Sequence, residues 1–241
     1  MVLTERFRTA VADRYQQVDR CAELVPMVLA QACVAVLPVV GAGITLTDEL
    51  RVPLGASDTT AARAETLQTT LGEGPCLTAS GQDAPLVADL ERIASTWPLF
   101  HRQFVAETPY GSIVSLPLSS PQSRLRFGAL DLYLEEPDQV PDFFLDEVMT
   151  HIAVPVADLL FGRGSLAGPD AGPLPPWLNT DPVNRRMHVW VAVGMLIEFA
   201  GVDNSDALAA LRAYAFSHDL TLDALADQMM SEQLEPESVL S

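Results

Sequence analysis

Three consecutive segments with helical periodicity, in residues 181–230, constrain the fold of this chain more than any other feature. The first segment begins at Asp181-Pro182, where a side-chain acceptor for free amides precedes a residue whose fixed φ suits a first helical turn. Apolar residues then recur at helical spacing until Gly201 ends the run. This pattern predicts one short helix.

Two more short helices are predicted after it. Asp203 and Asp206 form a capping box in which Asp stands for the usual Glu or Gln. Either Asp219 or Thr221 opens the third helix, which ends near Met230. Three helices in roughly fifty residues predict a small bundle, too small to hold a catalytic cleft of its own.

One motif extends through all three helices. Its members are Arg186-x-x-Val189-x-x-Ala192-Val193-Gly194-Met195-Leu196, Asp206-Ala207, Leu211-Arg212, Ala215 and Leu222-x-x-Leu225-Ala226. The motif resembles an ANTAR domain, a family of RNA-binding transcription antitermination modules. The resemblance implies that the bundle binds stem-loop RNA. Two weakly binding modules gain from effective concentration, so a homodimer is expected as well.

Four residues of the bundle are expected to serve RNA binding. Arg185, Arg186 and Arg212 are the three basic residues from residue 181 onward, where ten acidic residues accompany them. Because a guanidinium group suits bidentate contacts with phosphate, the resemblance makes these three the phosphate contacts. Gly194 would allow close approach of RNA or of a neighbouring helix.

The whole chain is acidic, with 32 Asp and Glu against 14 basic residues, all of them Arg, and a net charge of −18. Such a balance argues against nonspecific attraction to nucleic acid or to an anionic membrane. RNA loops can instead be recognised by stacking on aromatic side chains, for which His188, Trp190 and Tyr214 are candidates. Packing within the bundle is the alternative role for Trp190 and Tyr214.

Cysteine usage and hydropathy predict a cytoplasmic protein. The three cysteines are few and unpatterned, so no disulfide framework is expected. Leu24–Thr47 carries no charge, but its Pro and Gly residues favour a buried helix followed by a strand over a membrane span. The four histidines are scattered and lack ligand spacing, and neither a metal nor another cofactor is expected.

Residues 23–162 alternate between helical and strand patterns. Helices are predicted at residues 26–36, 59–71 and 142–161, the last kinked by Pro155, and strands at 44–46, 51–54, 86–88, 112–118 and 127–134. Helices that flank a largely antiparallel sheet define an α+β layer architecture.

A second motif lies in this region. It comprises Leu71-Gly72-Glu73-Gly74-Pro75-Cys76, Val87-x-Asp89-Leu90, Trp97-Pro98-x-Phe100, Gly111-Ser112-x-x-Ser115-x-Pro117-Leu118 and Gly128-Ala129-Leu130-x-Leu132-Tyr133. These residues resemble the GAF sensory domains that precede ANTAR in actinobacterial regulators. GAF domains as a class bind small molecules or dimerise, so the resemblance implies an unidentified small-molecule ligand or signalling protein.

The remaining segments connect or flank these two regions. Residues 1–22 form a predicted helix, capped by Thr4, whose apolar stripe packs either on a second copy or within the chain. The Pro/Gly linker 163–180 contains Trp177, which is expected to anchor it to one module. The ANTAR-like region covers 181–231, and the acidic tail 232–241 is predicted to be disordered.

Four residues of the GAF-like region are candidates for a ligand pocket, and each has a structural alternative. Cys76 follows a Gly-rich turn and is either a reactive thiol or a small buried apolar group. Trp97 and Phe100 either line a pocket or fasten a helix to the sheet. Asp89 either contacts a ligand or caps a turn. Gly72 and Gly74 are best explained by a tight turn.

The sequence therefore predicts a signal-responsive transcription antitermination regulator that is not an enzyme. A protein-interaction regulator is the first alternative, because Val193 replaces the Lys that the ANTAR family commonly has and the surface is acidic. A thiol redox enzyme is the second, because some GAF domains reduce oxidised methionine through cysteines.

Overall fold

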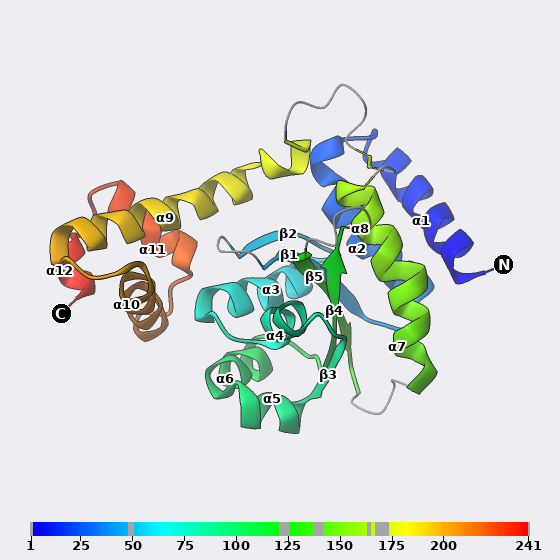
Figure 1. Cartoon of the computed structure of the whole chain (residues 1–241), viewed down its shortest axis with the longest axis horizontal. Helices are drawn as coiled ribbons and strands as arrows, with labels where there is room; N and C mark the ends of the chain where they lie inside the picture. Colours follow the sequence, from blue (N-terminus) through cyan, green and yellow to red (C-terminus); the bar gives the residue numbers. More distant parts are fainter. Residues whose placement is uncertain are drawn as a thin grey trace.

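The computed structural model of the 241-residue chain describes residues 2–47, 51–120, 126–136, 142–162, 165–166 and 174–240. Within these ranges the centre of the fold is a five-stranded sheet with the strand order β2-β1-β5-β4-β3 (Figure 1). The strands are Gly41–Leu46 (β1), Val52–Ala56 (β2), Leu86–Asp89 (β3), Ser112–Ser119 (β4) and Arg126–Leu134 (β5). Every pairing is antiparallel, as the sequence predicts.

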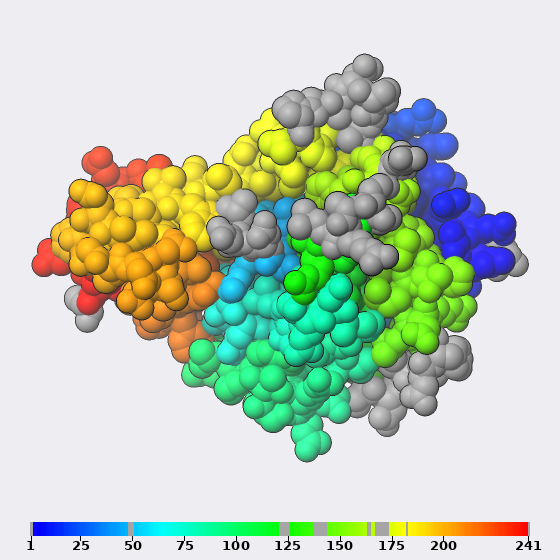
Figure 2. Space-filling view, viewed as in Figure 1, coloured from blue at the N-terminus to red at the C-terminus, as the bar shows by residue number. Residues whose placement is uncertain are grey.

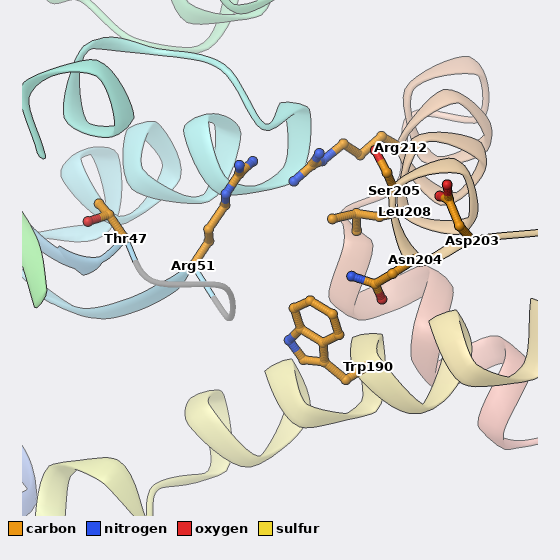
Figure 3. Close-up of a pocket in the computed structure, with 8 residues that line it drawn as sticks. All are labelled: Thr47, Arg51, Trp190, Asp203, Asn204, Ser205, Leu208 and Arg212. Atoms are coloured by element: carbon orange, nitrogen blue, oxygen red, sulfur yellow. The ribbon is translucent and has the colours of Figure 1, made fainter. Parts of the chain in front are cut away.

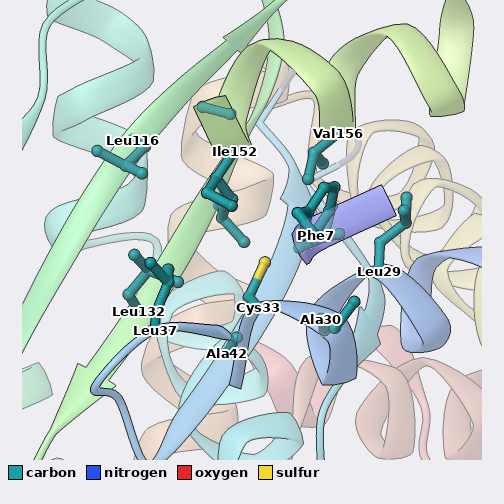
Figure 4. Close-up of a cluster of buried hydrophobic side chains, with 14 of the residues drawn as sticks. Phe7, Leu29, Ala30, Cys33, Leu37, Ala42, Leu116, Leu132, Ile152 and Val156 are labelled. Atoms are coloured by element: carbon teal, nitrogen blue, oxygen red, sulfur yellow. The ribbon is translucent and has the colours of Figure 1, made fainter. Parts of the chain in front are cut away.

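One face of the sheet is covered by helices from both ends of this unit. They are Leu3–Gln17 (α1), the 3-10 turn Ala22–Leu24 (η1), Val25–Val36 (α2), Asp142–Val148 (α7), the π-helical turn Met149–Ala153 (η3) and Val154–Phe161 (α8). Alternate residues of the central strand β5, such as Leu130 and Leu132, enter this core. In Figure 4 Cys33 of α2 lies among Phe7, Ile152 and Leu132.

The other face of the sheet carries Thr59–Leu71 (α3), Pro75–Gln82 (α4), Leu90–Thr96 (α5) and Pro98–Glu107 (α6). Its core is smaller and includes Phe100, Phe104 and Ile113. The intervening residues of β5, Asp131 and Tyr133, point to this side, because strand residues alternate between faces. The α+β layer architecture predicted from the sequence is confirmed.

The C-terminal helices form a separate bundle with a core of its own. They are Asp181–Ala200 (α9), Asn204–Ser217 (α10), Leu222–Met230 (α11) and Pro236–Val239 (α12). Gly201 ends α9 in the left-handed conformation, and the Asp203 carboxylate accepts from the Asp206 amide at 2.9 Å, as predicted. Of the two candidates for the third start, Thr221 is the cap, since its hydroxyl accepts from the Ala224 amide.

The linker is fixed to the α+β unit through Trp177, in the turn Pro176–Leu178 (η4). The Trp177 side chain is fully buried, and its ring meets Phe161 of α8 edge-on at 6.2 Å. The chain enters α9 three residues after η4, and α9 extends from there into the bundle. The space-filling view shows the bundle, orange to red, at one end of the molecule (Figure 2).

Three local predictions need correction or refinement. Thr4 does not cap α1, because it lies inside that helix and its hydroxyl is hydrogen-bonded to His151 Nδ1 at 2.8 Å. The apolar stripe of α1 packs within the chain, through Phe7 and Val11. Near Pro155 the helix widens into the π-helical turn η3, because proline has no amide to donate.

The C-terminal tail is also ordered rather than disordered. Its helix α12 contacts α9 and α10, and Val239 is buried in the core of the bundle. The acidic composition that suggested disorder belongs to the side chains that face solvent. No helix among the described residues is long and apolar enough to cross a membrane.

The anchor at Trp177 can be tested by truncation. Trp177→Ala should lower the free energy of unfolding by about 3 kcal/mol or more, because it empties a fully enclosed aromatic site. Urea unfolding followed by circular dichroism measures the change. Leu174→Ala, at a side chain that is 63% exposed in the same segment, is the matched control. An equal effect of the two substitutions would contradict the anchor.

Candidate functional site

The described residues contain two polar assemblies away from the free surface. The first is a buried group of acidic and hydroxyl side chains between the sheet and α3. The second is a group of arginines where the helical bundle meets the α+β unit. The sequence motifs pointed to parts of both without showing which residues meet.

Glu65 of α3 is the centre of the buried acidic group. It is 1% exposed, and its two carboxylate oxygens accept hydrogen bonds from the hydroxyl groups of Thr45 and Tyr133, each at 2.5 Å. Gly43 makes this position accessible, because a Cβ atom there would lie only 2.2 Å from Glu65 Oε1. A glycine on β1 is therefore required for the Glu65 side chain to lie against the sheet.

A second buried carboxylate, Asp131 of β5, adjoins the first. It accepts from Ser115 Oγ at 2.6 Å and from Gln68 Nε2 at 2.5 Å, while Gln68 Oε1 accepts from the Cys76 amide at 2.9 Å. This last bond ties α4 to α3 across the turn that contains Gly74. The network therefore positions the start of α4 relative to the sheet.

The two carboxylates lie in a region with little compensating positive charge. Burial raises the pKa of Glu65 well above its ordinary value, and the neighbouring Asp131 raises it further. Burial raises the pKa of Asp131 to about 6 against the lowering effect of its hydrogen bonds from Ser115 and Gln68. A proton shared within the pair relieves the repulsion between like charges, which is typical of adjacent buried carboxyl groups.

Cys76 behaves as a buried apolar group in this setting. Its side chain is fully buried, and burial together with Asp131 and Glu65 raises the pKa of the thiol well above its ordinary value. A thiol that keeps its proton is a poor nucleophile. The structural interpretation of Cys76 is therefore favoured over the reactive one. All three cysteines are free.

The other three predicted pocket residues also have structural roles. Asp89 caps α5 by accepting from the Arg92 amide at 2.7 Å. Trp97 and Phe100 are buried in the core between α6 and the sheet, where the rings of Phe100 and Phe104 lie tilted by 35° with their centroids 5.0 Å apart. The turn interpretation of Gly72 and Gly74 agrees with their positive φ angles of 73° and 147°.

Arg186 joins the bundle to the α+β unit through a buried side chain. It is 2% exposed; its Nη2 donates to Thr69 Oγ1 of α3 at 3.0 Å and pairs with Asp223 Oδ2 of α11 at 3.1 Å. Burial lowers the pKa of Arg186, and Asp223 partly offsets that effect. In this arrangement the guanidinium group that was expected to contact phosphate is enclosed by protein.

Arg212 also faces the α+β unit. Its guanidinium group lies over Gly72, since a Cβ atom at Gly72 would be 2.4 Å from Arg212 Cζ. Burial, Arg51 and Arg186 together lower the pKa of Arg212 to about 10. Arg51, just before β2, donates from Nη1 to the Gly72 carbonyl at 3.3 Å. Gly72 is thus the point on which both guanidinium groups converge.

A pocket of about 590 Å³ opens beside these two arginines. Figure 3 shows Arg51 and Arg212 pointing toward each other from opposite sides, with the indole of Trp190 beside the gap. The remaining lining consists of the polar residues Thr47, Asp203, Asn204 and Ser205 and the apolar Leu208. The pocket therefore belongs to both units.

The remaining predicted RNA-binding residues lie on the outside of the bundle. Arg185 is exposed, and so is Gly194, where an added Cβ atom would meet open space. Among the stacking candidates, His188 is hydrogen-bonded to Asp227 at 2.8 Å, and Tyr214 stacks on His218 with ring centroids 3.9 Å apart. The structure thus separates Arg185 from Arg186 and Arg212.

Sequence reasoning missed Arg51, Thr69 and Asp223. Arg51 sits next to a predicted hairpin turn, and a lone arginine there usually faces solvent. Thr69 and Asp223 are ordinary members of helical patterns, and their meeting with Arg186 joins three distant segments. No signal of spacing along the chain could have revealed it. No group of metal-ligand type occurs among the residues that the structure describes.

The α+β unit places this chain among proteins whose sheet is enclosed by helices on both faces. No protein-family model and no curated protein matches the chain. It is similar to the solved structure of fRMsr of Staphylococcus aureus in its reduced form, at 13% identity and a TM-score of 0.44, over 64% of this chain and 90% of that one.

Two GAF domains of phosphoenolpyruvate-protein phosphotransferases are also similar. The domain from Coxiella burnetii shows 16% identity and a TM-score of 0.46, over 64% of this chain and 92% of that one. The domain from Acinetobacter shows 15% identity and a TM-score of 0.41, over 67% and 95%. At these identities the likeness concerns the fold alone, and the ANTAR resemblance stays a prediction from the residues.

The buried carboxylates predict a specific pH dependence. Their pKa values are raised in the folded state, so the stability that they contribute is greatest below about pH 4 and is lost as the pH rises through the folded values, about 6 for Asp131. Between about pH 5 and pH 7.5 the free energy of unfolding should therefore fall less in Asp131→Asn than in the parent chain. Asp146→Asn, at an exposed carboxylate, is the control. An unchanged pH slope in Asp131→Asn would refute this assignment.

Proposed function

We propose that this chain is a signal-responsive regulator of transcription termination. Its α9–α11 bundle binds stem-loop RNA, and its GAF-like α+β unit controls that binding. The ANTAR and GAF motifs support the two roles. The observation that carries the control is that two of the three arginines implied as phosphate contacts, Arg186 and Arg212, are held against the α+β unit.

The contact with Thr69 supplies a physical basis for that control. A guanidinium group cannot bind an RNA phosphate while it is 2% exposed and bonded to Thr69 and Asp223. Arg185 remains available on the surface. In the arrangement described here the bundle therefore presents one exposed cation of its three, and its affinity for RNA is low. Release of the junction adds Arg186 and Arg212 to the RNA-binding surface, and a signal acts by favouring or opposing that release.

A signal acts in this way only if it binds one arrangement better than the other. A homodimer would multiply the effect, because two bundles held together bind two stem-loops at a raised effective concentration. The acidic net charge makes the control sharper: with few cations available, each arginine that is withheld removes a large share of the attraction to phosphate.

Thr69→Val tests this model, because it keeps the side-chain volume and removes the oxygen that holds Arg186. The affinity of the full chain for a stem-loop RNA should rise about tenfold, the equivalent of one charged hydrogen bond of roughly 1.4 kcal/mol. Fluorescence anisotropy at fixed salt measures it. Thr66→Val is the matched control, because the Thr66 hydroxyl bonds only within α3, to the Ala62 carbonyl.

Two further measurements complete the test. Unpaired RNA of equal length should bind weakly to every variant. Arg185→Ala should weaken stem-loop binding and reduce its salt dependence. The proposal is wrong if neither the parent chain nor Thr69→Val prefers the stem-loop to unpaired RNA.

If neither protein prefers the stem-loop, a protein-binding regulator is favoured instead. One observation supports that function. The outer face of α9 exposes Met187 and Val191, at 46% and 47%, next to the open Gly194. Val193 itself is 1% exposed in the core of the bundle, so the residue that replaces the family's Lys serves packing here. A lysine at position 193 would have to enter that core.

A further inference from the structure

The pocket at the junction brings together two arginines and an indole while the bundle is docked on the α+β unit. We propose that it binds a small molecule carrying a phosphate group, with Arg51 and Arg212 on the phosphate and Trp190 against the rest of the molecule. The proposal that this ligand binds is independent of the proposed function, whereas its role as the signal rests on that function.

Among the described residues, the two guanidinium groups have no countercharge. Neither Arg51 nor Arg212 forms an ion pair with any described residue, in a chain that has 32 acidic side chains. The Asp203 carboxylate lines the pocket but is engaged in capping α10. Burial lowers the pKa of Arg212 most, and Arg51 and Arg186 lower it further. Two facing, partly buried cations favour an anion between them.

Most of the hydrogen-bond donors of these groups also have no partner among the described residues. Arg212 Nε is buried without a partner, and Arg51 makes a single bond at 3.3 Å to the Gly72 carbonyl. A guanidinium group has five N–H donors in a planar fork that matches the oxygens of a phosphate. The free donors of two such groups would satisfy a phosphate, and a buried donor left unpaired costs free energy.

Gly72 fixes both groups at the pocket wall. Its carbonyl accepts from Arg51, and the absence of a side chain lets Arg212 lie directly over its Cα atom. The Leu71–Cys76 motif, which the sequence analysis assigned to a tight turn, thus builds a surface on which guanidinium groups from the two units meet. The motif positions the site without contacting the ligand.

The size and lining of the pocket suit a small molecule with an uncharged part. About 590 Å³ falls within the range of ordinary ligand pockets. The half-exposed indole of Trp190 offers a flat apolar surface beside the arginines, while Asn204 and Ser205 add polar groups.

Titration of the full chain tests the site with three probes: inorganic phosphate, AMP and adenosine. Calorimetry should show saturable binding of phosphate, tighter binding of AMP, and none of adenosine. Arg51→Gln and Arg212→Gln should each weaken AMP binding at least about tenfold, the effect of losing a charged hydrogen bond. Trp190→Ala should make AMP no better than phosphate. Arg102→Gln, at an exposed arginine of α6, should change nothing.

Circular dichroism and the unfolding midpoint show whether each variant is folded. Absence of saturable phosphate and AMP binding in the folded parent would overturn the proposal, and so would equal AMP affinity in the parent, Arg51→Gln and Arg212→Gln. Failure of this proposal can be told apart from failure of the proposed function. If the chain binds stem-loop RNA but not phosphate, only the ligand site is refuted. If it binds phosphate but not stem-loop RNA, only the RNA-binding function is refuted.

Discussion

The contact of Arg186 with Thr69 and Asp223 determines how the two parts of this molecule relate. A guanidinium group keeps its charge when buried, so its enclosure requires partners on every side where they can be provided. Asp223 provides the countercharge from inside the bundle, and Thr69 provides an oxygen from the α+β unit. A polar contact of this kind therefore joins the bundle to the α+β unit, beside the packing of α9 on β2 and of α10 on α3.

The geometry around this contact allows two arrangements of the junction. In the state described here Arg186 and Arg212 face α3 and its C-terminal turn; in the other they face solvent and any phosphate it contains. Placing Arg51 opposite Arg212 opposes the first state, because like charges repel there. An anion in the pocket removes that repulsion. The same arginines thus connect the signal, the junction and the RNA-binding surface.

The sequence predicts those elements of secondary structure that are encoded by local patterns. The β5 pattern alternates Leu130, Asp131, Leu132 and Tyr133, and the start of α10 is specified by a carboxylate three residues from the amide that it caps. Helices α4 to α6 were missed as elements, since they are short and begin at Pro75, Leu90 and Pro98, where turn residues dominate the local pattern.

The buried pair of Glu65 and Asp131 could not be predicted, because 66 positions of chain separate its members and only the arrangement of β1, β5 and α3 brings them together.

A double-mutant cycle between Thr69 and Arg186 is the most direct test of the junction. Thr69→Val, Arg186→Gln and the double variant are each unfolded in urea at neutral pH, and the coupling free energy is taken from the four proteins. The contact predicts a coupling of about 1 kcal/mol or more, in the range of a charged hydrogen bond. Strictly additive effects of the two substitutions would show that Arg186 is not held by the α+β unit.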